Sequence, residues 1–421
     1  MSAGLRAGYK QTEVGVIPED WEVGTIGNLC SAVLDCHHST PVWTTTGEVV
    51  IRNQNIRDGK LDLSQPSHTD AGHFAERTRR AIPTRGDLVI TREAPMGLVC
   101  MIPEGLKCCL GQRMVLLRPD SKVVDAQYLL YSILSETVQR AISVAGGTGS
   151  TVANLRIPVL KELLIAAPSR SEQRAIAAAL SDVDALLAKL NEFIAKKRDL
   201  KQAAMQQLLT GQIRLPGFSG AWATRPTASF SAFVTKGATP TTYGFKWESD
   251  GVIFLRSECV SADGLDLHQS MFISEQAHAA LIRGEVRSGD ILITITGNVG
   301  RVVLLDRNIG VANINQHIAR IRITVADVSP AFVFHWLSQP SVRHYYSTIT
   351  TGQAYPQISL KQVRETHVPL GSIAEQTAIA TVLSDMDTEL AALEARRDKT
   401  RALKQGMMQE LLTGRIRLPA N

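Results

Sequence analysis

Polar side chains in two loop-rich segments suit one definite chemistry, which is hydrogen bonding to DNA bases. Arg, Asn and Gln carry paired donors and acceptors that match the edges of guanine and adenine in the major groove. Any one such residue is more often an ordinary surface residue, so the prediction applies to the set. The candidates for DNA contact are Arg52, Asn53, Asn55, Arg92, Gln112 and Arg113 in the first half of the chain, and Lys236, Thr239, Tyr243, Arg256, Arg301, Gln316 and His317 in the second.

Motifs for catalysis are missing from the sequence. It contains no GxxxxGKS/T phosphate loop, no GxGxxG fingerprint after a strand, and no nuclease-type cluster of paired acids with a lysine. The glycine-rich run 146–151 lacks the phosphate-loop lysine, and we predict a turn or hydrogen-bonding loop there. Cys30, Cys36, His37 and His38 match no common zinc spacing, and the two histidines are predicted to be surface loop residues. The sequence therefore predicts binding rather than catalysis, with no metal or cofactor of its own.

One long stretch occurs twice and organises the rest of the chain. Residues 172–216 and 375–419 align without a gap at an offset of 203, and 27 of the 45 positions are identical. Apolar residues recur at alternating steps of four and three, which is the heptad pattern of helices that pair. The seam consists of Ile176, Leu180, Val183, Leu187, Leu190 and Ile194 in the first copy, and Ile379, Leu383, Met386, Leu390 and Leu393 in the second.

Each copy is predicted to be one helix, 172–209 and 375–412, with a length of roughly 55 Å. Ser169 and Glu172 fit a capping box at the start, while Gly211 and Gly414 fit C-terminal stops. Both helices carry basic clusters, for which a solvated face or a protein contact is the favoured interpretation and phosphate contact the alternative. The clusters are Lys196, Lys197, Arg198 and Lys201, and Arg396, Arg397, Lys399, Arg401 and Lys404.

The blocks that precede the two helices are also related, although more weakly. Residues 50–52 correspond to 254–256, and 86–91 correspond to 289–294, where both copies keep a Gly-Asp pair predicted to be a structural turn. The repeat closes end to end, because the N-terminus supplies Tyr9 and Trp21 where the first helix is followed by Phe218 to Trp222. The N-terminal segment is therefore predicted to continue the last helix.

These patterns predict an α+β protein with a pseudo-two-fold internal duplication. Two globular domains are separated by two long helices that pair as an antiparallel coiled coil. The predicted boundaries are 1–170 for the first domain, 171–216 for the central helix, 217–373 for the second domain and 374–421 for the C-terminal helix.

Composition is compatible with a polyanion partner but does not require one. The 421 residues are 44% hydrophobic and 20% charged, with a net charge of +5. No apolar run approaches a membrane span, and the first residues contain no hydrophobic signal region. The six cysteines show no paired framework, so a reducing cytoplasm is expected.

Three motifs give the chain a resemblance to the specificity subunits of type I restriction–modification systems over essentially its full length. They are the opening GYKQTEVGVIPEDW, the block-ending P-x-x-x-EQ at 168–173, and LLTGQIRLP with its twin LLTGRIRLP. The second block departs slightly, because Pro369 lies two residues further from its Glu-Gln pair. Any one motif is weak, whereas the combination is specific.

The resemblance implies that two target-recognition domains each read half of a bipartite double-stranded DNA site. It also implies that the helices form a spacer on which two modification (methyltransferase) subunits and the restriction (motor-nuclease) subunits assemble. S-adenosylmethionine and ATP are then expected on those partners. The alternatives are a self-contained DNA methyltransferase or nuclease, and a coiled-coil protein adaptor. The missing catalytic motifs argue against the first, and the strong divergence of the two blocks argues against the second.

Overall fold

The computed structural model describes residues 7–146, 154–261, 264–306, 309–352 and 354–419. The chain divides into two compact units. Unit 1 contains Met1–Asn191 and Arg396–Asn421, and unit 2 contains Glu192–Ala395. Two helices of 39 residues, α6 (Arg170–Leu208) and α11 (Ile373–Leu411), each contribute residues to both units.

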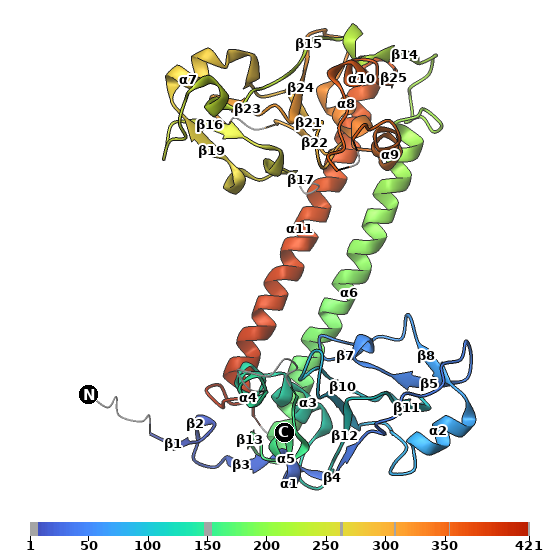
Figure 1. The fold of residues 1–421 in the computed structure, drawn as a ribbon, viewed down its shortest axis with the longest axis vertical. Helices are drawn as coiled ribbons and strands as arrows, with labels where there is room; N and C mark the ends of the chain where they lie inside the picture. The colour runs from blue at the N-terminus through green and yellow to red at the C-terminus, as the bar shows by residue number, and fades with distance from the viewer. Residues whose placement is uncertain (1–6, 147–153, 262–263, 307–308, 353, 420–421) are drawn as a thin grey trace. The chain divides into compact units, whose positions relative to one another are not determined.

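Unit 1 is built on a four-stranded antiparallel sheet in the order β10-β9-β12-β4 and a three-stranded sheet in the order β11-β5-β8 (Figure 1). Its strands are β1 (Tyr9–Thr12), β2 (Gly15–Pro18), β3 (Glu22–Thr25), β4 (Cys30–Asp35), β5 (Glu48–Ile51), β6 (Ile56–Arg57), β7 (Lys60–Leu61), β8 (Ser67–Thr69), β9 (Leu88–Thr91), β10 (Val99–Met101), β11 (Cys108–Leu110), β12 (Met114–Pro119) and β13 (Leu164–Ala167). Its shorter helices are α1 (Ile26–Leu29), α2 (Ala71–Arg77), α3 (Ala126–Leu134), α4 (Glu136–Ala145) and α5 (Ile157–Lys161).

Unit 2 repeats this plan with two four-stranded sheets, β15-β24-β21-β22 and β19-β16-β23-β20. Its strands are β14 (Ala223–Pro226), β15 (Ser231–Lys236), β16 (Val252–Leu255), β17 (Val260–Ser261), β18 (Gly264–Leu265), β19 (Met271–Ile273), β20 (Glu285–Val286), β21 (Ile291–Thr294), β22 (Val302–Leu304), β23 (Ala312–Ile314), β24 (Ile318–Ile323) and β25 (His367–Leu370). Its shorter helices are α7 (Glu275–Ala280), α8 (Pro330–Leu337), α9 (Pro340–Thr348) and α10 (Leu360–Arg364).

The strand registers show that the repeat extends through the blocks. In unit 1, Leu116 of β12 is paired with Val89 of β9, and in unit 2 Arg320 of β24 is paired with Leu292 of β21. The Gly-Asp turns are equivalent as well: the Asp87 carboxylate accepts from Arg118 Nη2 at 2.7 Å, and the Asp290 carboxylate accepts from Arg322 Nη2 at 2.7 Å. Both aspartates are buried, which confirms that these pairs are structural.

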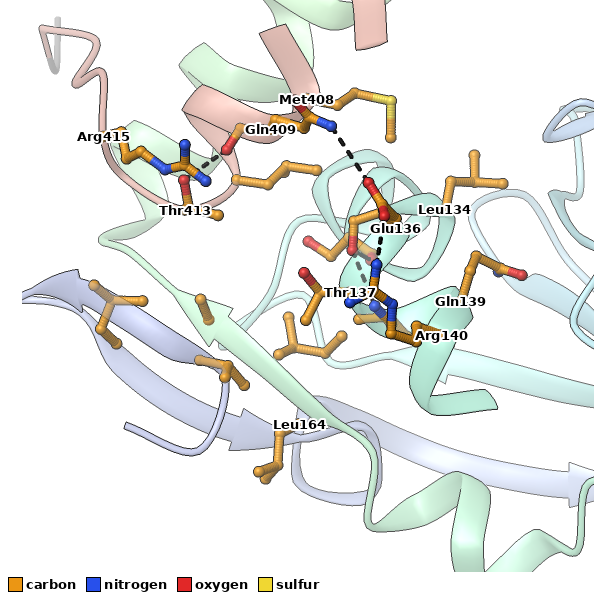
Figure 2. A pocket seen from close by; sticks show the side chains of 18 of the residues that line it. Leu134, Glu136, Thr137, Gln139, Arg140, Leu164, Met408, Gln409, Thr413 and Arg415 are labelled. Atoms are coloured by element: carbon orange, nitrogen blue, oxygen red, sulfur yellow. Dashed lines mark hydrogen bonds and ion pairs between the residues drawn. The ribbon is translucent and has the colours of Figure 1, made fainter. Parts of the chain in front are cut away.

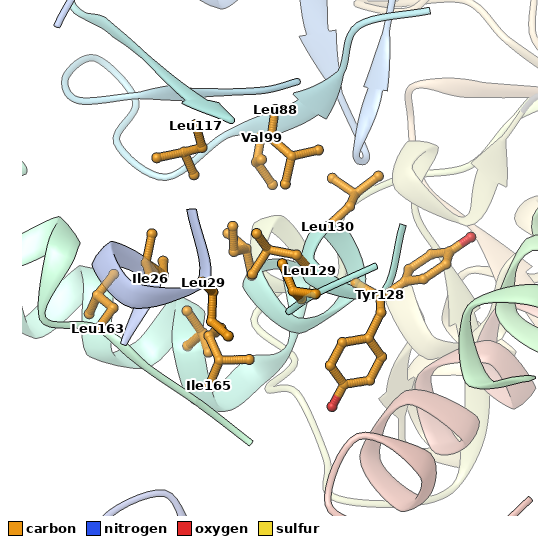
Figure 3. Close-up of a cluster of buried hydrophobic side chains, with 14 of the residues drawn as sticks. Ile26, Leu29, Leu88, Val99, Leu117, Tyr128, Leu129, Leu130, Leu163 and Ile165 are labelled. Carbon is orange, nitrogen blue, oxygen red and sulfur yellow. The ribbon is translucent and has the colours of Figure 1, made fainter. Parts of the chain in front are cut away.

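The core of unit 1 gathers around α3 (Figure 3). Leu129 and Leu130 of this helix pack with Leu88 and Val99 of the large sheet. Ile26, Leu29, Leu163, Ile165 and Leu117 belong to the same buried cluster. The first apolar residues of the long-helix seam, Ile176 and Leu180, are fully buried in this core too. The start of α6 is therefore part of the domain core, and not of the helix pair alone.

The sequence from Ala126 to Ile142 predicts one continuous helix, and this prediction is wrong. The structure has two helices, α3 and α4, that meet at Ser135. Ser135 has extended backbone angles (φ −63°, ψ 149°), and its hydroxyl accepts from the Val138 amide as an N-cap. A serine at this point supplies a new helix start, and the apolar spacing alone does not reveal that.

The ends of the long helices follow the sequence signals only in part. The Ser169 and Ser372 hydroxyls accept from the amides of Glu172 and Glu375, as N-caps do. Gly211 and Gly414 have φ of +71° and +68°, so both predicted stops are confirmed. The capping box is wrong in one respect, because the Glu172 carboxylate bonds Trp21 and Arg417.

That carboxylate anchors the N-terminal segment of unit 1 to the end of α11. Glu172 is buried and accepts from Trp21 Nε1 at 3.1 Å and from Arg417 Nη2 at 2.7 Å. Arg417 also pairs with Asp20, and Tyr9 Oη donates to the Gly414 carbonyl at 2.9 Å. These contacts confirm that the N-terminal segment continues the last helix.

Unit 2 has the same anchor, and its tryptophan and arginine both come from the segment that directly follows α6. Glu375 is fully buried and accepts from Trp222 Nε1 at 3.0 Å and from Arg214 Nη2 at 2.6 Å. The glutamines next to these glutamates also have equivalent roles in the two units. Gln173 accepts from the Asp125 amide at the start of α3, and Gln376 accepts from the Ser329 amide at the start of α8. The repeated Glu-Gln pair thus binds each long helix to its block.

Ion pairs join α6 and α11 within each unit. In unit 2, Lys201 pairs with Asp387, Lys197 with Glu389 and Arg198 with Glu394. In unit 1, Lys404 pairs with Asp184 at 2.8 Å, and this pair is the repeat equivalent of Lys201 with Asp387. In unit 2 residue numbers fall on one helix as they rise on the other. In unit 1 the start of α6 (Ile176) shares a buried cluster with the end of α11 (Leu411), while Asp184 pairs with the earlier Lys404. The helices are therefore antiparallel in each unit. These four basic residues therefore join the helices to each other, which is a protein contact, as the favoured interpretation of the basic clusters allowed.

Candidate nucleic-acid interface

The DNA-contact candidates of unit 1 lie in the loops that follow β5, β9 and β11. Arg92 N donates to the Arg113 carbonyl at 2.8 Å, and Gly111 N donates to the Ile51 carbonyl at 2.7 Å, which ties the three loops together. Gln112 Nε2 donates to the His38 carbonyl and Asn53 Nδ2 to the Ala94 carbonyl. The structure thus brings Asn53, Gln112 and Arg113 into one loop cluster.

Two further unit 1 candidates, Asn55 and Arg92, also have structural partners. Asn55, at the end of the short 3-10 turn Asn53–Asn55, is 2% exposed; its side chain accepts from Arg52 N and donates to the Asp62 carbonyl. Arg92 is 14% exposed, forms an ion pair with Asp35 at 3.1 Å and donates to the Leu155 carbonyl. Both side chains hold loops in place in this structure.

Arg52 lies over an aromatic ring that the sequence analysis missed. Its guanidinium carbon is 4.8 Å from the centre of the Trp43 ring, and Trp43 is 44% exposed. An exposed tryptophan next to an arginine offers a surface on which a base or sugar can stack. The only sequence signal for it was a large aromatic residue within a polar loop.

In unit 2 the equivalent loops bring Thr239, Gln316 and His317 together. Thr239 Oγ1 donates to Gln316 Oε1, and Gln316 Nε2 lies 2.9 Å from His317 Nε2. Ile295 N donates to the His317 carbonyl at 2.8 Å, as Arg92 N does to the Arg113 carbonyl in unit 1. Gln316 and His317 are therefore the structural equivalents of Gln112 and Arg113.

The remaining unit 2 candidates differ in their accessibility. Lys236 ends β15 and is exposed, and Tyr243 is 60% exposed on the loop after it. Arg256 donates to the Gln269 carbonyl at 3.0 Å. Arg301 is half-buried, and its Nε has no hydrogen-bond partner among the described residues. Arg256 is half-buried as well, as are Thr239, Gln316 and His317.

Another exposed aromatic residue beside this group was also missed. Tyr355 is 73% exposed in a loop held by Gly297 N, which donates to the Pro356 carbonyl at 2.9 Å. That loop forms a bridge from Gln357 to Thr296, one residue after Ile295. The corresponding loop of unit 1, which includes the glycine-rich run, lies at 147–153 and outside the described residues.

A cavity in unit 1 is separate from the candidate residues. It measures about 750 Å³ and lies between α4 and the end of α11, where Gln409 Nε2 donates to Glu136 at 3.3 Å (Figure 2). Arg140 and Arg415 contribute to its lining, and none of the DNA-contact candidates does.

Metal chemistry and membrane insertion find no support in the part of the chain that the structure describes. No group of three or more His, Cys, Asp or Glu there could hold a metal ion. His37 and His38 lie in the loop after β4, where His38 contacts Asp35 and His37 contacts Glu76. All six cysteines are free and buried, and burial raises the pKa of Cys100 to about 12. No helix in the described residues combines the length and the hydropathy that a membrane crossing needs.

Comparison with known proteins identifies the class to which this architecture belongs. The model of the type I restriction modification DNA specificity domain matches residues 18–197 and again residues 233–401. The chain therefore belongs to this family, and it contains two copies of the family's domain, in agreement with the duplication.

Relatives and solved structures agree with this membership. The chain is similar to the type I restriction enzyme MjaVIII specificity subunit of Methanocaldococcus jannaschii, with 23% identity over 96% of this chain and 94% of the relative. It is 25% identical to the EcoBI specificity subunit of Escherichia coli over 65% and 62% of the two chains. Its fold is similar to the S subunit structure from M. genitalium, with a TM-score of 0.59 at 18% identity over 93% and 96%.

These findings confirm the fold class and the functional class expected from the sequence. The chain is a specificity subunit of a type I restriction–modification system, and the two domain copies fit a DNA site in two parts. Specificity subunits recognise DNA and are not catalytic, which confirms that the chain itself is not the enzyme. The alternatives of a self-contained enzyme or a protein-only adaptor are thereby set aside.

Proposed function

We propose that unit 1 and unit 2 each read one half of a bipartite double-stranded DNA site through the loop clusters described above. One observation carries the proposal. The equivalent loops of the two units carry different side chains at a position that could contact a base, whereas the residues that anchor each block to its long helix are the same. Arg113 is replaced by His317, whereas the buried Glu172 and Glu375 anchors are the same. Different polar side chains on a common frame suit two different half-sites.

The contacts to bases are assigned to nine members of the candidate set. These are Arg52, Asn53, Gln112 and Arg113 in unit 1, and Lys236, Thr239, Tyr243, Gln316 and His317 in unit 2. Asn55, Arg92, Arg256 and Arg301 act in this proposal as supports that hold the loops in position. Lys236, as an exposed cation at a strand end, is suited to a phosphate contact.

The chain works in this proposal with two modification subunits and with restriction subunits in the cytoplasm. S-adenosylmethionine and ATP bind those partners and not this chain. Its part in adenine methylation is to place DNA so that a partner can take the target base out of the stack.

Methylome sequencing of a host with and without the gene for this chain tests the proposal. We expect an asymmetric, bipartite adenine-methylated motif that depends on the chain, and methyl transfer in vitro only when a modification subunit is added. Robust methyl transfer by the purified chain alone, or a motif without two separated parts, would contradict it.

A further inference from the structure

Arg113 has a backbone conformation that its residue type disfavours. Its φ is +67°, in the left-handed region that glycine adopts readily and that a side chain with a β-carbon opposes. It lies in the short loop between β11 and β12, and its carbonyl is held by the Arg92 amide at 2.8 Å. An arginine kept where glycine would fit better suggests that the side chain has a function there.

The side chain is held on one edge only. Arg113 Nε lies 3.0 Å from Glu93 Oε2, and Glu93 Oε1 accepts from Asn154 Nδ2 at 2.6 Å. Glu93 is 19% exposed, whereas Arg113 is 57% exposed. The two Nη atoms make no hydrogen bond to any residue in the described ranges. The guanidinium is thus oriented through Nε while its two terminal donors stay accessible.

This arrangement fits one base. Two parallel N–H donors of an arginine match the O6 and N7 acceptors of guanine in the major groove, which adenine, cytosine and thymine do not present as a pair. The ion pair between the Glu93 carboxylate and Nε restricts the rotamers of the Arg113 side chain before DNA binds. Less side-chain entropy is therefore lost when the contact forms.

We infer that Arg113 reads one guanine in the half-site bound by unit 1, and that Glu93 is its positioning residue. The inference rests on the proposed function, which gives unit 1 a half-site. In unit 2 the equivalent positions are His317 and Thr296, so the arginine–carboxylate pair is absent there and the guanine belongs to the first half-site alone.

The test uses the chain assembled with its modification subunit and a duplex that carries its mapped methylation motif. Each guanine of the unit 1 half-site is replaced in turn by 7-deazaguanine, which lacks the N7 acceptor, and binding is measured at fixed salt. The wild-type complex should lose roughly 2- to 13-fold in affinity at one guanine, about half of the free energy of a bidentate base contact, because O6 remains as an acceptor. R113Q should bind that substituted duplex and the unmodified duplex equally, and still discriminate at every other position. E93Q should reduce the discrimination at that guanine only.

Two further variants separate recognition from folding. R113G places glycine at the left-handed position, so it should fold at least as well as the wild type and still lose the guanine preference. R85Q removes a matched surface arginine of unit 1, because Arg85 Nη1 pairs with Glu104 at 2.7 Å and both side chains are largely exposed. R85Q should leave the discrimination unchanged.

Two outcomes overturn the inference while leaving the proposed function intact. One is a wild-type complex that discriminates its motif but is insensitive to 7-deazaguanine at every position. The other is an R113Q complex weakened equally on all sequences, which is the behaviour of a phosphate contact. A wild-type complex with no sequence preference at all would instead mean that the proposed function has failed.

Discussion

The buried glutamate at the start of each long helix shows how one residue connects segments far apart in the chain. Glu172 is 4% exposed and binds both Trp21 and Arg417, the latter 245 positions away. A buried carboxylate needs both a counter-charge and hydrogen bonds to stay ionised at low cost. The anchor therefore couples the fold of unit 1 to residues from both ends of the chain.

Replacing Arg417 by Met should destabilise unit 1, because it leaves the Glu172 carboxylate buried without its cation. We expect a loss of roughly 2–3 kcal/mol in the free energy of unfolding, below the range for a fully buried pair because the arginine is 40% exposed. Differential scanning calorimetry of the variant measures the change.

Arg415 provides the matched control for this measurement. It is 60% exposed and pairs with Glu410, which is 36% exposed, at the same end of α11. R415M should alter the free energy of unfolding by less than about 0.5 kcal/mol. Equal losses in R417M and R415M would show that the anchor is not a stabilising contact.

At the scale of elements, the two units hold their long helices through different aromatic or imidazole groups. Tyr131 of α3 donates to Asp184 of α6 at 2.8 Å, and the equivalent His335 of α8 lies 3.1 Å from Ser384 Oγ of α11. Burial lowers the pKa of His335 to about 4, with Asp387 opposing the shift and Lys201 reinforcing it. His335 is therefore neutral in the folded protein near pH 7.

Acid should consequently weaken unit 2 through His335. The folded pKa lies below the unfolded value of about 6.5, so the unfolded state binds the proton first, and stability is lost as pH falls below 6.5. Between pH 7 and pH 5 the loss should be roughly 2 kcal/mol.

Urea unfolding at several pH values should show a shallower pH dependence for H335Q. The exposed His344 of α9 is the control, and H344Q should keep the wild-type slope. Parallel slopes for H335Q and wild type would refute the assignment.

The long helices also carry a prediction about the spacing of the DNA site. Four residues inserted after Glu192 in α6 and four after Ala395 in α11 fall at repeat-equivalent positions on the boundary of the two units, so the ion pairs inside each unit are kept. The added length is at most about 6 Å, or about two base pairs. Four residues are also a stutter that locally unwinds a heptad seam, so part of the length can be lost. The unread spacer should grow by one or two base pairs with both half-sites unchanged. Methylation sequencing decides the question, since an active variant with the original spacer would mean that the helices do not set the distance.

At the scale of the whole molecule, each unit has its own core and its own loop cluster. The large buried clusters centred on α3 and on α8 draw their residues from unit 1 and unit 2 respectively. Recognition should therefore be modular, although tethering makes the second contact intramolecular and neither half-site alone should bind well.

Exchanging residues 217–373 for the corresponding block of a relative should change one half-site and leave the other as it was. The motif is read by methylation sequencing of a host that carries the chimaera. The reciprocal exchange of the first block serves as the control and should change the opposite half. A chimaera in which both half-sites change would contradict separate readout.

The sequence by itself determined the features that depend on local spacing or on comparison of the chain with itself. The duplication, the two long helices with Gly211 and Gly414 at their ends, and the structural Gly-Asp turns all follow from residue patterns within a few positions. The lack of catalytic motifs likewise pointed to a binding protein before any fold was known.

Only the tertiary structure decided how polar side chains are used, because their partners lie far away in sequence. Glu172 fits a local capping box, yet its carboxylate bonds Trp21 and Arg417. The sequence did not show what Lys201 and Lys404 contact, and each pairs with an aspartate of the other long helix. A charged group goes to the partner that offsets its desolvation best, and that choice depends on which surfaces the fold brings within about 4 Å.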